Sequence, residues 1–141
     1  MVMVPFCMSA GWVLPSSSRI AFDWRWRVDS LPVDLREDSL PSHDYLSIAV
    51  EFDDGQDLTY YWSSALPVGT VYRCPLPTWK DKETHVVVRS GTAELGHWLH
   101  ERRDVHADYR RCIGGTARSI ERVWLIDTES EDGNQATLVD K

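Results

Sequence analysis

The sequence predicts an all-β fold, a jelly-roll-like antiparallel β-sandwich that carries one short helix. Three observations favour it: strict alternation of apolar and polar residues in several segments, turn signals between those segments, and seven tryptophans among 141 residues. Alternation with a period of two is typical of strands that bury one face. Short strands separated by turns favour a sandwich over a fold in which strands alternate with helices.

The segment 19–28, RIAFDWRWRV, is the clearest expected strand. Its two sides differ in chemistry, with apolar side chains at Phe22, Trp24, Trp26 and Val28 and charged ones at Asp23, Arg25 and Arg27. Tryptophan buries a large area and commonly serves packing. We therefore expect Trp24 and Trp26 in the core and the charged side chains outside it.

The segments 45–52 and 58–63 predict a hairpin, because both alternate and the Asp-Gly step at Asp54-Gly55 between them suits a tight turn. In the second segment Tyr60 and Trp62 fall on the inward side, whereas Thr59 and Tyr61 fall on the outward side. Trp24, Trp26, Tyr60 and Trp62 thus form the expected aromatic core.

Further elements follow along the chain. Residues 84–90 predict a strand buried on both sides, residues 120–128 another, and a last strand begins near residue 137. Between them, Asp104 is the expected N-cap of a short helix that ends before Gly114. We expect Arg103 and Asp108 to form an ion pair that fastens this helix, and Tyr109 to fill the core beside Trp98.

The predicted organisation is a single β-sandwich domain over residues 19–141, preceded by an arm or an extra strand over residues 1–18. The net charge of −7 argues against nucleic acid and anionic membranes as partners. The three cysteines, Cys7, Cys74 and Cys112, have no zinc-ribbon spacing, and a reduced, cytoplasmic protein is the simpler interpretation. Nucleotide and hydrolase motifs are absent from the sequence. We therefore expect no cofactor and no metal.

Several motifs resemble a known family when they are taken in order. They are WRWRV at 24–28, LTYYWSS at 58–64, LGHW at 95–98, and a W…E-x-R-x-V-x-x-D-Y stretch carried by Trp98, Glu101, Arg103, Val105, Asp108 and Tyr109. This order resembles the bacterial family of unknown function DUF3047. The resemblance implies a jelly-roll-like sandwich similar to carbohydrate-binding modules, usually in an exported protein. We expect this chain to lack the export signal and the first strands of the family, and the sheet edge that those missing strands would leave could be covered by a second protomer in a homodimer.

The polar side of the strands is the candidate site. If the two tryptophan-bearing strands lie in one sheet, their polar side chains share a face, and the plain interpretation is a solvated, salt-bridged surface. The functional interpretation is a concave pocket. The catalytic candidates there are Glu51, Asp23 and Tyr61, and the ligand-binding candidates are Arg25, Arg27, Thr59 and Trp124.

Three hypotheses for the function remain open. The first is a domain that binds a sugar-like or anionic small molecule on that face. The second is a small cofactor-free enzyme, such as an isomerase, cyclase or lyase, that uses the same face for acid–base chemistry. The third is an interaction domain that dimerises through an open sheet edge.

Overall fold

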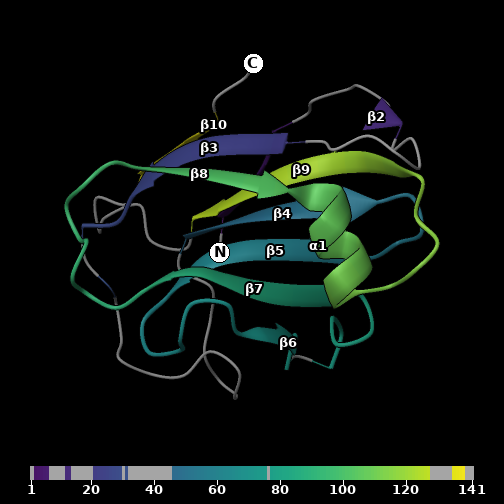
Figure 1. Cartoon of the computed structure of the whole chain (residues 1–141), viewed down its shortest axis with the longest axis horizontal. Coiled ribbons are helices and arrows are strands. Elements are labelled where there is room, and N and C mark those ends of the chain that lie inside the picture. The colour runs from purple at the N-terminus through teal and green to yellow at the C-terminus, as the bar shows by residue number, and fades with distance from the viewer. Residues whose placement is uncertain are drawn as a thin grey trace.

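The computed structural model describes residues 2–6, 12–13, 21–29, 31, 46–75, 77–127 and 135–138. These residues form two β-sheets and one helix (Figure 1). The larger sheet has the order β1 (Val2–Phe6), β9 (Ser119–Asp127), β4 (Leu46–Phe52), β5 (Asp57–Ser63), β7 (Glu83–Ser90) and β6 (Val71–Arg73), with β2 (Trp12–Val13) also paired to β9. The smaller sheet has the order β10 (Gln135–Leu138), β3 (Ala21–Arg27) and β8 (Leu99–Asp104). An all-β fold with one short helix is confirmed.

The core lies between the two sheets and is built on two facing rows of aromatic side chains. Trp24 of β3 packs on Tyr60 of β5 with ring centroids 5.4 Å apart, and Trp26 packs on Trp62 at 5.9 Å. All four side chains are fully buried. The predicted aromatic core is therefore confirmed. Its two rows come from opposite sheets, because strands of two stacked sheets turn their apolar faces toward each other.

Helix α1 (Val105–Cys112) follows β8 without a loop. As predicted, the Asp104 side chain caps it by accepting a hydrogen bond from the Ala107 amide at 2.9 Å. Gly114, with a φ of 70°, ends it as expected. The expected contact between Tyr109 and Trp98 is wrong. Tyr109 instead packs on Phe52, with centroids 4.5 Å apart, whereas Trp98 is 39% exposed.

Three features of the sheets went unpredicted, the first being the short strand β6 beside a proline-rich segment. Strand β8 is absent from the sequence-based assignment because its inward position Glu101 is charged, which hides the alternation. In addition, β5 and β7 pair in parallel within an otherwise antiparallel larger sheet. The chain makes this possible by passing from β5 to β6 on the far side of β7 before it returns as β7 itself. The loop predicted over residues 29–44 lies mostly outside the described residues.

Candidate functional site

The predicted site residues fall on two opposite outer faces. Asp23, Arg25 and Arg27 lie on the outer face of the smaller sheet, because β3 belongs to that sheet. The other candidates lie on the outer face of the larger sheet, at Glu51 of β4, Thr59 and Tyr61 of β5, and Trp124 of β9. The expectation of one shared polar face is therefore wrong. β3 and β5 belong to opposite sheets and both point their tryptophans into the core. Their polar side chains therefore lie on opposite outer faces.

The outer face of the smaller sheet is occupied by its own contacts. The guanidinium groups of Arg25 and Arg27 lie over the Trp98 ring, 5.7 and 5.5 Å from its centroid. The buried Asp23 carboxylate lies 3.0 Å from His100 Nε2. Cation–π contacts at such partly exposed positions each contribute about 1 kcal/mol or less. This half of the predicted constellation is a salt-bridged surface.

The outer face of the larger sheet carries a denser polar cluster, arranged by strand register. Tyr72 of β6 is directly opposite His85 of β7, and the next matching positions on this face are Cys74 and Glu83. The Cys74 amide donates to the Glu83 carbonyl at 3.0 Å and so extends the β6–β7 ladder by one residue. Since side chains two residues apart share a face, the four residues form a square array.

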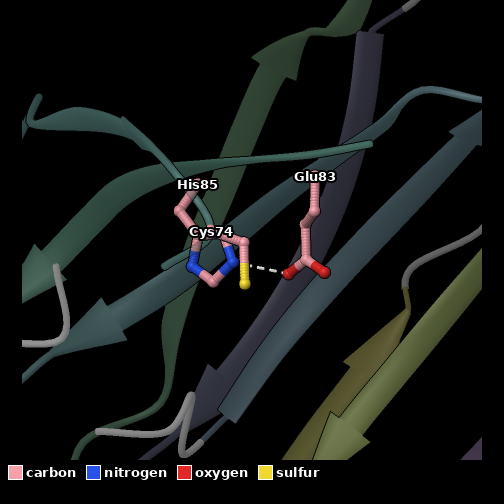
Figure 2. Close-up of side chains that lie close together, drawn as sticks. All are labelled: Cys74, Glu83 and His85. Atoms are coloured by element: carbon pink, nitrogen blue, oxygen red, sulfur yellow. Dashed lines mark ion pairs between the residues drawn. The ribbon is translucent and has the colours of Figure 1, made fainter. Parts of the chain in front are cut away.

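Three side chains of this array converge, as Figure 2 shows for Cys74, Glu83 and His85. The thiol, one carboxylate oxygen and one ring nitrogen all lie within 4.8 Å of one another. His85 Nε2 is 2.5 Å from Glu83 Oε1, the pair joined by the dashed line. Cys74 and His85 are only 5% and 3% exposed. Such a cluster of sulfur, nitrogen and oxygen donors is able to hold a metal ion.

Hydrogen bonds connect this cluster to two of the predicted site residues. The Tyr72 hydroxyl lies 3.2 Å from His85 Nδ1 and donates to the Tyr61 hydroxyl at 2.8 Å. The Thr59 hydroxyl donates to Glu83 Oε1 at 3.2 Å. Thr59 and Tyr61 are both fully buried. They therefore support the side chains of the cluster from its β5 side.

Carboxylates also cross the larger sheet in one row. Glu51, Asp57 and Glu83 occupy matched positions on β4, β5 and β7. Burial, followed by the charges of Glu51 and Glu83, raises the pKa of Asp57 to about 7. Glu51 itself accepts a hydrogen bond from Trp124 Nε1 at 3.3 Å, which places the predicted ligand-binding residue Trp124 beside a predicted catalytic one.

A cleft of about 500 Å³ opens at the edge of the sandwich, between the β6 side of the larger sheet and α1. It is lined by Val68, Gly69, Val71, Val86, Val87, Arg103, Arg111 and Cys112. Val68 and Val71 are 63% and 41% exposed there, although most large apolar side chains of the described residues are buried. The cleft thus combines an apolar wall with two guanidinium groups.

Both arginines of the cleft share one carboxylate. Arg103 forms two hydrogen bonds to Asp108, at 2.9 and 3.0 Å, which confirms the predicted ion pair. Arg111 reaches the same carboxylate at 2.8 Å. Two positive charges against one negative charge leave this group with a surplus of one positive charge. The end of the cleft nearest α1 is therefore suited to an anion.

Sequence reasoning missed Cys74, Glu83 and His85, and also the cleft. A signal for the cluster is present: Tyr72-x-Cys74 and Glu83-x-His85 both have strand periodicity. The strand over 84–90 was predicted, but the prolines between the two pairs favoured a loop in place of its partner strand β6.

This chain is a β-sandwich protein, because its two sheets pack face to face and carry only one short helix. The sequence profile of the family of unknown function DUF3047 matches residues 14–139, and the chain belongs to that family. No curated protein and no solved structure matches it. Within the described part of the chain, no helix has the length and apolar character needed to cross a membrane.

Proposed function

We propose that this chain is a small-molecule-binding domain, and that its ligand is an organic anion with an apolar body. The binding site is the cleft between β6 and α1. One observation carries the proposal: the apolar wall of the cleft ends at two guanidinium groups that have only one carboxylate between them.

The size and lining of the cleft support a small ligand. Small-molecule sites typically measure about 300–1,000 Å³ and combine apolar walls with a few polar groups that fix orientation. The cleft, at about 500 Å³, falls within this range, and its apolar wall is formed mainly by four valines. An apolar ligand body would remove Val68 and Val71 from water, which favours binding by the hydrophobic effect.

The charge of the cleft supports an anionic head group. The Arg111 side chain is 64% exposed while it contacts Asp108, so its remaining N–H donors face solvent. A ligand carboxylate could accept two of these in the bidentate geometry that arginine favours. A sugar has less support here because it needs many hydrogen-bonding partners, and the lining offers chiefly the two arginines.

An acid–base enzyme also has less support than a binding domain. Its candidate groups do not converge, because Asp23 lies on the smaller sheet while Glu51 and Tyr61 lie on the outer face of the larger one. Tyr61 is moreover fully buried.

Calorimetry with straight-chain carboxylates of increasing length, and with the matching alcohols, tests the proposal. We expect the carboxylates to bind with an affinity that rises with chain length, and the alcohols to bind about tenfold more weakly or worse, since charge-assisted hydrogen bonds contribute about 1.5–3 kcal/mol.

Arg111→Ala should weaken carboxylate binding about tenfold by the same argument. Arg110→Ala is the matched control, since Arg110 is the exposed neighbour on α1 that does not line the cleft. Val68→Glu should abolish binding, because it places a negative charge at the mouth. Equal affinity in wild type, Arg111→Ala and Val68→Glu would overturn the proposal, as would failure of every carboxylate to bind.

A further inference from the structure

We propose that Cys74, Glu83 and His85 form a zinc site on the outer face of the larger sheet. The site is separate from the cleft, and the inference does not depend on the proposed function. The three residues supply a sulfur, an imidazole nitrogen and a carboxylate oxygen, which is a donor set that Zn²⁺ accepts.

Strand register brings the three donors together. Glu83 and His85 are two residues apart on β7 and so share a face, and the β6–β7 ladder places Cys74 opposite Glu83. Their donor atoms lie within 4.8 Å of one another. In a tetrahedral zinc site with bonds of about 2.0–2.3 Å, ligand atoms lie about 3.3–3.6 Å apart. Zinc binding therefore requires side-chain rotations that move His85 Nε2 and Glu83 Oε1 apart from 2.5 Å and bring the more widely separated donors closer (Figure 2).

The hydrogen bonds of His85 orient it as a metal ligand. The Tyr72 hydroxyl donates to Tyr61, so its oxygen is available to accept a hydrogen bond from His85 Nδ1–H. This leaves the lone pair of Nε2 directed at Glu83 Oε1, 2.5 Å away. With no metal bound, a proton held between these two atoms satisfies both, and zinc binding displaces this proton because metal ligands bind in their deprotonated form. Metal-ligating histidines commonly donate their second ring N–H in this manner, which fixes the tautomer and the ring plane.

Two other assignments of the cluster fit less well. In a nucleophilic cysteine site, a histidine nitrogen would face the thiol to take its proton. Here the two ring nitrogens face Tyr72 and Glu83 instead. A simple ion pair between Glu83 and a protonated His85 satisfies the nitrogen, but it leaves Cys74 without a role.

The surroundings of the cluster favour a dication. Asp57 and Glu51 continue the row of carboxylates that begins at Glu83, so the local potential is negative. The thiol and the imidazole select against Ca²⁺ and Mg²⁺, which prefer oxygen ligands. Three protein ligands leave a fourth position for water, as in zinc sites that are not purely structural.

Zinc titration of the chelator-treated, reduced full-length chain tests the proposal, with a competing chromophoric chelator to measure affinity. We expect one Zn²⁺ per chain and a rise in the melting temperature with Zn²⁺ but not with Mg²⁺. Co²⁺ should give the absorption of a tetrahedral site and a thiolate-to-cobalt charge-transfer band. Failure of the wild-type chain to bind one equivalent of Zn²⁺ would overturn the proposal without any variant.

Substitutions then assign the ligands. Cys74→Ser, Glu83→Gln and His85→Gln should each weaken zinc binding about tenfold or more, since even residues that only support metal ligands contribute about 10–100-fold. Cys74→Ser should also lose the charge-transfer band. The matched controls are Cys112→Ser and His106→Gln, which change a thiol and an imidazole outside the cluster.

A Cys7→Ser/Cys112→Ser variant should keep both the stoichiometry and the band, because Cys74 is then the single thiol of the chain. Should Cys74→Ser fail to fold, this double variant still decides the question. Loss of the band from the double variant, or unchanged affinity in folded Cys74→Ser and His85→Gln, would show that zinc binds elsewhere.

Discussion

The Tyr60 hydroxyl donates a hydrogen bond of 2.8 Å to the carboxylate of Asp108, and this bond joins the core of the larger sheet to the helix. Asp108 is 5% exposed and also accepts from Arg103 and Arg111. Because a single carboxylate satisfies three donors from three elements, it fixes the position of α1 and the wall of the cleft together.

Removing the Asp108 charge should therefore destabilise the fold more than removing one donor. We expect Asp108→Asn to lower the free energy of unfolding by about 2–4 kcal/mol, since it leaves the half-buried Arg103 without its counter-charge. Tyr60→Phe should cost about 1–2 kcal/mol, the contribution of one hydrogen bond to a charged group. Urea denaturation measures both. Arg110→Ala, an exposed change on the same helix, should stay within about 0.5 kcal/mol. Equal costs for all three would contradict this account of Asp108.

The two core tryptophans of β3 should respond differently to the same substitution. Trp26 Nε1 donates to Glu101 at 3.3 Å, whereas Trp24 Nε1 has no hydrogen-bond partner in the described part of the chain. Both Trp→Phe changes lose packing, but Trp26→Phe also removes a bond to a buried carboxylate, which contributes about 1.5–3 kcal/mol. Denaturant unfolding should thus show a larger loss for Trp26→Phe. A larger loss for Trp24→Phe would reject the assignment of the Trp26–Glu101 bond.

Asp57 predicts a dependence of stability on pH. Its folded pKa, about 7, lies above the unfolded value near 3.8. Below pH 4 the carboxyl is protonated in both states and costs nothing, whereas above pH 7 its charge is buried beside Glu51 and Glu83. Stability should therefore fall as the pH rises from about 4 to 7. Asp57→Asn should remove this slope and stabilise the chain at pH 8 relative to wild type.

Unfolding at pH 5 and pH 8 in the presence of a chelator measures the effect of Asp57→Asn. Asp53→Asn is the control. Asp53 is exposed, and a hydrogen bond from the Arg118 backbone lowers its pKa. Its carboxyl group is therefore ionised in both the folded and the unfolded protein throughout this range. Its substitution should leave the slope between pH 5 and pH 8 unchanged. A wild-type slope that persists in Asp57→Asn would assign it to another group.

Gly115 should tolerate no side chain. A Cβ at this position would lie 2.8 Å from Asp54 Oδ2 and closer still to the Tyr109 hydroxyl, which donates to that oxygen. Gly115→Ala must therefore separate Tyr109 from Asp54, and we expect a loss of about 1–3 kcal/mol in urea unfolding. Gly55→Ala is the comparison, because its cost comes from a positive φ alone and no atom lies within 4 Å. That cost is about 1 kcal/mol. A smaller loss at Gly115 than at Gly55 would contradict the steric argument.

Local pattern was sufficient to predict the strands β3, β4 and β5 and their faces, but it could not predict which sheet each strand joins. The inward direction of Trp24 and Tyr60 follows from alternation within each segment. That these two side chains belong to opposite sheets depends on pairing between strands far apart in the sequence, such as β3 with β8. The predicted site failed at this step, because the outward side chains of β3 and β5 could share a face only within a single sheet.

Strand β8 and the pairing of Cys74 with Glu83 were missed because they lie in charged or irregular segments. Glu101 lies at an inward position of β8 and is buried because Trp26 and Arg89 satisfy its carboxylate. In the sequence, its charge makes it look like a surface residue. Cys74 and Glu83 face each other across a turn whose prolines suggest a loop. In both cases the partner that makes the position favourable is distant in sequence, and no single segment contains the information.

The place of β9 in the larger sheet has a consequence for synthesis on the ribosome. β9 lies between β1 and β4 and is made about seventy residues after β4. The β4–β5 hairpin can form early. The opposite edge of β4, which pairs with β9, keeps its backbone N–H and C=O groups unpaired until β9 emerges. An unpaired apolar edge readily joins other chains. The nascent protein is therefore most exposed to misassembly just before its last strands are released, and chaperones would have most effect in that interval.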